Sequence, residues 1–401
     1  MRLTCRLVGA VLVLALAVPA GARDHVVKLR MGPFRIEAKR DREVCQVVRV
    51  PKIPPNTSVV SWEARSRLRR GGQVASHHLV AYGYTGTAGL AAFRKGVFDS
   101  PGCVEIGPSD FFARRTFLAG SGGEFVKGNW SVSRAAMPGK LAQLLPSDGS
   151  GAIVALNSHY FNTSSKASTG FIEIALRLAP LAPGKKLLRQ VIHLDASRDI
   201  FVPPGGTQTV TSSFQADGAP NPASEQGANP SGDVCLFTLS THMHKRGTRF
   251  IVDYEDTTSS RRLLDWPDYL HPGTWLIDSL RTYEKAPGLL RAYTAENGFP
   301  RIRYACNFAN GVDGKLMKEG CEATPGVVPG MSGVQAAALG IAPNEAHAAP
   351  CGQDAANCAG KPCVDANLVF GPLSDDDMCV LTALVFDPTP GVPPDQACAI
   401  Y

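Results

Sequence analysis

The chain has 401 residues, with 41 Lys or Arg and 35 Asp or Glu, which gives a formal net charge of +6 at pH 7. At roughly 100–200 residues per domain, this length suggests two domains, each able to bury a core. The basic side chains form no clustered stripe along the sequence, which argues against nucleic acid or a membrane surface as a partner.

The N-terminus is typical of an export signal. Arg2 and Arg6 precede an apolar run from Leu7 to Val18, and Ala20-Gly-Ala22 has the small-residue pattern of a cleavage site. The run is shorter than the ~20 residues that a membrane-spanning helix needs, and no later stretch qualifies. We therefore expect residues 1–22 to be a signal peptide and the mature protein to be exported, either secreted or periplasmic.

Ten of the eleven cysteines follow this signal. An even number in an exported chain predicts a disulfide framework, although the pairing cannot be read from the sequence. The alternative, a thiolate metal site, lacks the paired C-x2-C spacing. The ten positions are Cys45, Cys103, Cys235, Cys306, Cys321, Cys351, Cys358, Cys363, Cys379 and Cys398.

Short strand patterns separated by Gly, Pro and Asn turns run from residue 23 to about residue 180. Such a pattern predicts an all-β sandwich or barrel rather than βαβ units. The expected strands are Val26–Met31, Val44–Val50, Ser58–Ala64, Val74–Tyr84, Ala152–Phe161 and Gly170–Leu178.

Leu181-Ala-Pro-Gly184 predicts a boundary between an N-terminal domain, 23–183, and a C-terminal domain, 184–401. A second set of strands follows it: Leu187–Leu194, Ile200–Val202, Thr207–Phe214, Val234–His244, Thr248–Tyr254, Trp275–Asp278, Arg301–Phe308 and Cys379–Phe386.

Two segments of the second half lack strand patterns. Residues 215–232 are rich in Pro, Ala, Gly and Asn and predict a long surface loop. Residues 310–374 are rich in Gly, Ala and Pro and contain four cysteines. Because a structureless loop of that length is uncommon in a compact domain, we interpret it as an insertion held by its own disulfides, with a short helix at Val334–Leu339.

The segment Thr238-Leu-Ser-Thr-His-Met-His-Lys-Arg-Gly247 contains the best candidate metal ligands. His242 and His244 stand two residues apart at the end of a predicted strand. Side chains at i and i+2 of a strand point to the same face, so both imidazoles can bind one metal ion without distorting the backbone.

Three other motifs carry candidate ligands, and each is ambiguous alone. The neighbours His77 and His78 reach one ion only at a β-bulge or a strand end; otherwise one faces the core and the other the solvent. A single strand histidine such as His159 is more often structural. Met378 either fills a gap in the core or serves as a soft thioether ligand, which suits Cu(I) and hardly serves zinc.

In their order along the chain, these motifs resemble the copper type II, ascorbate-dependent monooxygenases, the family of peptidylglycine α-hydroxylating monooxygenase and dopamine β-monooxygenase. The resemblance spans about Val44 to Cys398 and leaves 310–374 unmatched. It implies two antiparallel jelly-roll-like β-sandwich domains packed side by side. The matching elements are His77-His78, His159-Tyr160, His242-Met-His244-Lys-Arg-Gly247, Cys306 and Met378-Cys379.

The resemblance also implies the metal ligands and the chemistry. Two copper ions would act with O2 and with ascorbate as reductant to hydroxylate a C–H bond, with no catalytic residue beyond the copper ligands. The implied ligands are His77, His78 and His159 for an electron-transfer copper in the first domain, and His242, His244 and Met378 for an oxygen-binding copper in the second.

Disulfide pairs are implied as well. The resemblance pairs Cys306 with Cys379 and makes Cys235 the likeliest partner of Cys398. Cys45, in contrast, lacks the partner that the family has near residue 171, so we expect a rewired disulfide network in the first domain, with the insertion as one source of partners.

Three departures bear on the substrate. The peptide-amidating members have an arginine where this chain has Ser240, and an asparagine and a tyrosine where it has Val380 and Thr382. A serine cannot replace a bidentate arginine clamp on a carboxylate. We therefore expect a small organic substrate rather than a peptide; the residues that bind it are unknown.

Three hypotheses remain open on the sequence. The first is the copper-dependent monooxygenase, an oxidoreductase whose partners are a small molecule and O2, with no partner protein evident. The second is a non-catalytic exported copper-binding protein, for storage or delivery, on the same scaffold. The third is a zinc hydrolase, which would need a carboxylate near the His-x-His motif, such as Asp253 or Glu255.

Overall fold

The computed structural model describes fourteen stretches of the chain. The predicted signal peptide, the four cysteines between residues 321 and 363 and the predicted helix at Val334–Leu339 lie outside them. The described residues are 25–38, 40–69, 74–100, 103, 106–126, 131–162, 165–203, 205–244, 246–267, 274–276, 289–290, 300–310, 368–369 and 377–400.

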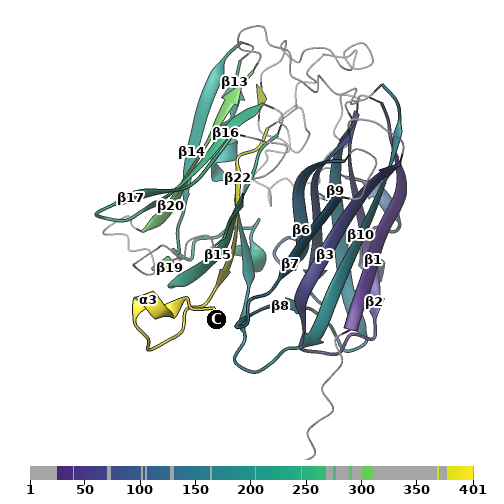
Figure 1. Ribbon diagram of the computed structural model, residues 1–401, viewed down its shortest axis with the longest axis horizontal. Coiled ribbons are helices and arrows are strands. Elements are labelled where there is room, and N and C mark those ends of the chain that lie inside the picture. Colours follow the sequence, from purple (N-terminus) through teal and green to yellow (C-terminus); the bar gives the residue numbers. More distant parts are fainter. Residues whose placement is uncertain are drawn as a thin grey trace, which may run out of the picture.

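The first half is a sandwich of two sheets (Figure 1). All strand pairs are antiparallel except β11–β8. One sheet has the order β1 (His25–Ile36), β10 (Ser168–Pro180), β3 (Thr57–Arg69), β8 (Leu141–Leu145) and β11 (Lys186–Leu187), with β7 (Ser131–Ala136) pairing with β3. The other has the order β5 (Val97–Asp99), β2 (Arg40–Pro51), β9 (Gly151–Asn162), β4 (Val74–Tyr84) and β6 (Arg115–Val126).

The second half repeats the arrangement with shorter strands. One sheet has the order β12 (Arg189–His193), β22 (Val380–Phe386), β15 (Val234–His242) and β18 (Thr274–Leu276), with β19 (Leu289–Leu290) on β15. The other has the order β14 (Thr207–Phe214), β20 (Arg301–Ala309), β16 (Gly247–Glu255) and β17 (Ser260–Trp266). A two-stranded ribbon joins β13 (Phe201–Val202) and β21 (Leu368–Val369). The short helices are η1 (Leu90–Ala92), η3 (Asp195–Asp199), η4 (Glu225–Gly227) and α3 (Pro394–Ala397).

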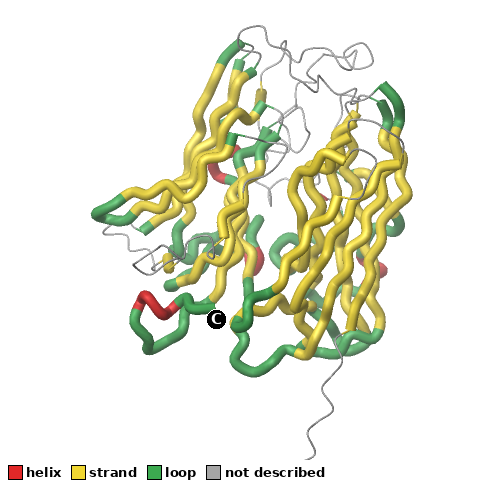
Figure 2. Tube along the Cα trace, viewed as in Figure 1, coloured by secondary structure: helices red, strands yellow, loops and turns green. Residues whose placement is uncertain are grey.

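Alternation of apolar residues explains the sandwich form. In β10, every second side chain from Ser168 to Leu178 is buried, and Ile172, Ile174 and Leu176 have no exposed surface. A strand that buries one face must pack it against another layer, and each half solves this with its second sheet. The predicted fold class is confirmed: the protein is all-β, with two antiparallel jelly-roll-like sandwiches side by side (Figures 1 and 2).

Several strands were not predicted, namely β5, β6, β7, β8, β17, β19 and β21. β6 is the instructive case, because its Gly120-Ser-Gly-Gly123 run has a low strand propensity. The strand forms because it pairs with β4 along most of its length. A Cβ atom at Gly120 would lie 3.1 Å from the carbonyl oxygen of Leu79, so this glycine also permits close approach of the two strands.

The segment 215–232 is a long loop without a strand, as predicted, and Asp217, Pro220 and Ser231 are exposed on the surface. Part of the loop is buried, however, at Ala223 and Ser224. The carbonyl of Ala223 accepts a hydrogen bond from Nη2 of Arg115 (3.2 Å), and the N–H of Gln226 donates to the carbonyl of Ala113 (3.0 Å). Composition indicated irregular backbone correctly, but it could not show that this backbone packs between the two halves.

Three disulfides occur in the described residues. Cys306–Cys379 and Cys235–Cys398 are the pairs that the resemblance implied. Cys45 bonds with Cys103, which corrects the expectation that the first domain draws partners from the insertion. The pairing of β2 with β5 brings them together, because Cys103 follows β5 closely and Cys45 lies opposite Phe98.

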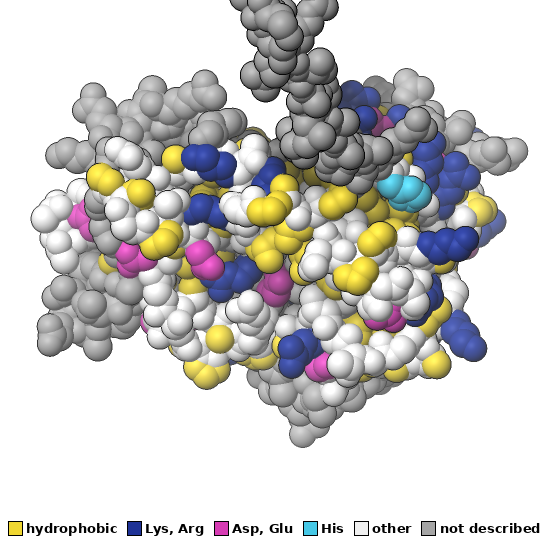
Figure 3. All heavy atoms as spheres, turned by 90° about the horizontal axis from the view of Figure 1, so that it is seen from below, with side chains coloured by type: hydrophobic (Ala, Val, Ile, Leu, Met, Phe, Trp, Pro, Cys, Tyr) yellow, Lys and Arg dark blue, Asp and Glu magenta, His cyan; other side chains and the backbone are white. Residues whose placement is uncertain are grey.

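The outer surface of the first half has many arginines, some of them paired with carboxylates. On the face shown in Figure 3, Lys and Arg are more numerous toward the right-hand edge than elsewhere. In the β1–β10–β3 sheet, Nε of Arg30 lies 2.9 Å from Glu173, and Nε of Arg134 lies 2.6 Å from Glu63. Among the described residues, no helix has the length and apolar character needed to cross a membrane.

Candidate metal centre

Four predicted ligand residues meet where the two halves face each other. The ring centroids of His78 and His159 are 5.5 Å apart, and those of His242 and His244 are 5.1 Å apart. The two pairs also touch, because His78 lies 5.6 Å from His242 and His159 lies 6.1 Å from His244. Each imidazole therefore contacts two others edge to face, and the four rings form one cluster in which a pair from the first half meets a pair from the second.

A β-bulge shapes the first-half side of this cluster. Ser76 of β4 lies opposite Tyr160 of β9, but His78 lies opposite His159, so the register shifts by one residue at His77. This is the backbone irregularity that two adjacent histidines need if both are to reach one ion. The backbone of His77 belongs to β4, whereas its side chain lies outside the described part of the structure.

The second-half side is formed by the end of β15 and the turn after it. His242 is the last residue of β15, opposite Val380, and His244 is buried in the turn. The turn is tight: its Gly247 N–H donates to the carbonyl of His244 (3.1 Å), and a Cβ at Gly247 would lie 2.6 Å from Cβ of Met243. The glycine of the His-x-His-x-x-Gly motif is therefore required by packing.

Met378 stands two residues before the paired part of β22. Continuing the β15–β22 register by two residues places its backbone opposite that of His244. Its partly buried side chain packs against an apolar cluster that consists of Ile192, Leu194, Ala223 and Val380.

A buried carboxylate connects this strand end to the histidine turn. Asp377 has no exposed surface, and its Oδ1 accepts hydrogen bonds from the N–H groups of His244 (2.7 Å) and Met378 (2.8 Å). Its Oδ2 accepts from the N–H of Arg246 (3.0 Å). Burial raises the pKa of Asp377 to about 7, while the three N–H donors and the Arg246 charge act in the opposite direction.

The imidazole of His78 forms a hydrogen bond with the side-chain amide of Asn157. Its Nε2 lies 2.6 Å from Oδ1 of Asn157 and 3.4 Å from Oε1 of Glu43. The Nδ2 of Asn157 donates to the same Glu43 oxygen (2.7 Å) and lies 3.0 Å from Sγ of Cys103. Glu43 therefore orients Asn157, and Asn157 orients the imidazole.

The electrostatics at His242 favour a neutral imidazole. Burial lowers the pKa of His242 well below its ordinary value, and positive charge on His244, His78 or His159 would lower it further. A neutral imidazole keeps the lone pair that a metal ion requires.

The donor set fits copper in its chemistry. Imidazole nitrogens suit copper in both oxidation states, and a thioether suits Cu(I). The described side chains include no group of three or more His, Cys, Asp or Glu already arranged to hold an ion. Copper would be held by these four imidazoles together with His77 and the thioether of Met378.

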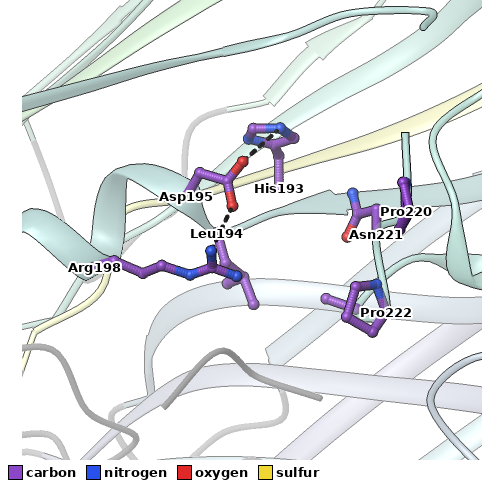
Figure 4. Close-up of a pocket in the computed structure, with 8 residues that line it drawn as sticks. His193, Leu194, Asp195, Arg198, Pro220, Asn221 and Pro222 are labelled. Atoms are coloured by element: carbon purple, nitrogen blue, oxygen red, sulfur yellow. Dashed lines mark ion pairs between the residues drawn. The ribbon is translucent and has the colours of Figure 1, made fainter. Parts of the chain in front are cut away.

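A small cavity lies beside the cluster against which Met378 packs (Figure 4). Its volume is about 40 Å³. Its walls include Asn221 and three residues connected by ion pairs, His193, Asp195 and Arg198. Nε2 of His193 lies 3.5 Å from the Asp195 carboxylate, and Nδ1 lies 2.9 Å from the Tyr304 hydroxyl. Burial lowers the pKa of His193. This volume suits one or two water molecules rather than an organic substrate.

Comparison with known proteins adds no assignment. No family model and no curated protein matches the chain. Solved structures that match include the PBSX exported protein XepA (8% identity, 70% of this chain and 86% of that chain, TM-score 0.17) and the Macrobrachium rosenbergii nodavirus (10%, 77% and 96%, TM-score 0.16). Deformed wing virus, a honeybee pathogen, matches at 11% identity over 77% and 94%, with a TM-score of 0.18. Scores this low carry no argument, so the fold and the site rest on the chain's own sheets and side chains.

Proposed function

We propose that the protein is a two-copper, ascorbate-dependent monooxygenase that hydroxylates a C–H bond of a small organic substrate. The observation that carries this proposal is the meeting of His78, His159, His242 and His244 between the two halves. These residues were selected from short sequence motifs, and they come from three strands and one turn. His25, which belongs to no such motif, is exposed at the start of β1.

The residues of the chain would hold and orient the metal. His77, His78 and His159 would bind one copper ion, and His242, His244 and Met378 the other. When bound, the copper ions would supply the electron transfer and oxygen activation, with ascorbate as the source of electrons. The burial of His159 and His244, each 2% exposed, keeps bulk water away from the site.

Two cross-strand neighbours support a small substrate. Ser240 of β15 lies opposite Thr382 of β22, and Val380 is two residues from Thr382 along the same strand. Hydroxyl and apolar groups at these positions provide no cation for a peptide's terminal carboxylate. The substrate is therefore expected to lack a free carboxylate at this end of the site.

The two carboxylates that the sequence suggested for a zinc hydrolase are engaged elsewhere. Asp253 of β16 forms an ion pair with Arg262, and Glu255 forms one with Arg301 (2.6 Å). Both lie in the sheet that does not contain His242. Neither is therefore placed to act as the acid or base of a hydrolase at the histidine cluster.

The proposal is tested with copper-loaded protein and ascorbate. We expect two copper ions per chain, a sulfur scatterer in the X-ray absorption spectrum of the Cu(I) form, and O2 uptake coupled to a hydroxylated product from a panel of small organic molecules. Ascorbate oxidation that does not depend on any added molecule would instead favour a copper storage or delivery protein.

Single substitutions sharpen this test. Met378→Ala should abolish hydroxylation and remove the sulfur scatterer while one copper ion stays bound by His77, His78 and His159. His25→Ala is the matched control, because it removes an exposed imidazole outside the cluster and should leave both copper ions and turnover unchanged. Full activity in Met378→Ala would remove the thioether from the mechanism.

A further inference from the structure

We propose that Asp377 is a positioning residue that places Met378 and the His242–His244 turn relative to each other, so that the sulfur and imidazole donors assemble as one unit. This inference rests on the proposed function. It concerns a residue that touches no substrate and acts only through the backbone of the copper ligands.

The hydrogen bonds of Asp377 join two distant parts of the chain. Oδ1 accepts from the N–H of His244 at 2.7 Å and from the N–H of Met378 at 2.8 Å, so two proposed ligand residues are anchored to the same oxygen atom. Oδ2 adds the N–H of Arg246 at 3.0 Å. The carboxylate has no exposed surface, so water does not compete for these donors.

The carboxylate acts where the sheet ends. The paired part of β15 and β22 stops at His242 and Val380. Beyond this point the ladder no longer fixes the distance between the strands, yet both His244 and Met378 lie beyond it. Asp377 connects the two backbones there. It therefore holds them at a fixed distance, as the hydrogen bonds between paired strands do elsewhere in the sheet.

A carboxylate suits this task better than an amide. An ionised carboxylate only accepts hydrogen bonds and offers about four lone-pair positions, enough for three converging N–H donors. An asparagine would turn an NH₂ group toward at least one of these N–H groups and lose that bond. Glutamate would keep the charge but move both oxygen atoms away from their positions.

Ser197 also anchors the start of β22, and its removal provides a control for the loss of Asp377. The N–H of Cys379 donates to Oγ of Ser197 (2.8 Å), and that hydroxyl donates to the carbonyl of Cys379 (2.9 Å). Ser197 thus anchors the residue after Met378 to η3 without involving the histidine turn. Removing it should loosen β22 but leave the link between sulfur and imidazoles in place.

The experiment compares the wild type with Asp377→Ala and Ser197→Ala, each loaded with Cu(I). Alanine removes all three acceptor contacts, whereas an asparagine could keep its oxygen on the N–H groups of His244 and Met378. For Asp377→Ala we expect the sulfur scatterer to be lost or reduced and the affinity of the second copper ion to fall by about 10–100-fold, with the first ion unaffected. For Ser197→Ala we expect a lower unfolding midpoint but unchanged copper affinity and sulfur signal.

The outcomes separate this inference from the proposed function. A wild type that binds copper without a sulfur scatterer would contradict the proposed function itself. A wild type with the scatterer, and an Asp377→Ala variant with the same scatterer and affinity, would overturn the positioning role alone. If Asp377→Ala does not fold, Asp377→Glu replaces it with the same readouts and the same expected losses.

Discussion

His78 shows how a neighbouring side chain decides which ring nitrogen of an imidazole can bind a metal ion. Its Nε2 lies 2.6 Å from Oδ1 of Asn157, whose Nδ2 is committed to Glu43. The amide oxygen therefore faces the ring, and the imidazole donates its proton from Nε2. The lone pair of Nδ1 is then the one that can bind a metal ion, because the hydrogen bond of one ring nitrogen fixes the role of the other.

Replacing Asn157 by Leu tests this at the residue scale. Leucine has the same number of side-chain heavy atoms in the same branching pattern, but it cannot accept the Nε2 proton, so the ring loses its orientation. We expect copper affinity at the His77, His78 and His159 ligands to fall by about 10–100-fold. A competition titration with a copper chelator measures this affinity.

The matched control makes the same chemical change elsewhere. Asn307 bonds the side chain of Thr209 (3.1 Å) on the β14–β20 sheet, and Asn307→Leu should leave copper affinity at the wild-type value. Equal affinities in the wild type and Asn157→Leu would show that the amide does not orient His78.

The sequence contained a usable signal for Asn157 but none for Asp377. Asn157 and His159 are two residues apart in a predicted strand, so alternation already placed them on one face. Asp377 is the last of three consecutive aspartates, and nothing local distinguishes it from its neighbours. Its role depends on N–H groups more than 130 residues away in the sequence, and such contacts exist only in the folded chain.

At the scale of elements, the Cys306–Cys379 disulfide fixes the strand that begins beside Met378. Cys306 lies within β20 and Cys379 immediately precedes β22, so the bond joins the two sheets of the second sandwich. The Cys306→Ser, Cys379→Ser variant should lose roughly 2–4 kcal/mol of unfolding free energy, because a closed loop of 73 residues is released in the unfolded chain.

Urea unfolding followed by far-UV circular dichroism measures this loss. The Cys45→Ser, Cys103→Ser variant is the comparison, since its disulfide lies in the first half and should not change the sulfur signal of Met378. A second-half variant as stable as the wild type would mean that the bond adds no stability.

The elements also show where strand prediction succeeds. β14 was predicted with its observed bounds, Thr207–Phe214, because it contains three threonines and follows the turn signal Gly205-Gly206. β6 was missed because pairing with β4, rather than its own propensity, decides its conformation. The sequence showed only that His77 and His78 need a β-bulge or a strand end to reach one ion. The register of β4 against β9 shows that a bulge is present at His77.

At the scale of the whole molecule, a buried acid lies at the junction of the two halves. Oε2 of Glu225 accepts the N–H of Gln190 (3.0 Å). Burial raises its pKa to about 6, with the hydrogen bonds from Gln190 and Thr116 and the charges of Arg189 and Arg115 acting in the opposite direction. The folded state therefore holds this proton more tightly than the unfolded state does.

The sign of the pH dependence follows from this. The contribution of Glu225 to stability is fully present below about pH 4.5 and is lost as the pH rises through about 6. The Glu225→Gln variant has no titrating group at this position, so this pH-dependent contribution to its unfolding free energy is absent. The difference in unfolding free energy between wild type and variant should therefore shift by on the order of 1–2 kcal/mol from pH 4.5 to pH 7, in favour of the variant at the higher pH.

Urea unfolding of both proteins at the two pH values checks this shift. Glu173→Gln serves as the control, because Glu173 pairs with Arg30 on the outer surface of the first half. A difference between wild type and Glu225→Gln that stays constant with pH would show that Glu225 titrates normally.

The sequence by itself determined the all-β class, the two sets of strands and the identity of the candidate ligands, because alternation and local motifs are properties of neighbouring residues. Only the tertiary structure decided that His78 and His159 meet His242 and His244, that Cys45 pairs with Cys103, and that Ala223 and Ser224 within the 215–232 loop are buried. The physical reason is that these contacts join segments far apart in the chain. Their geometry is set by sheet register and by the packing of one sandwich against the other, which no local pattern encodes.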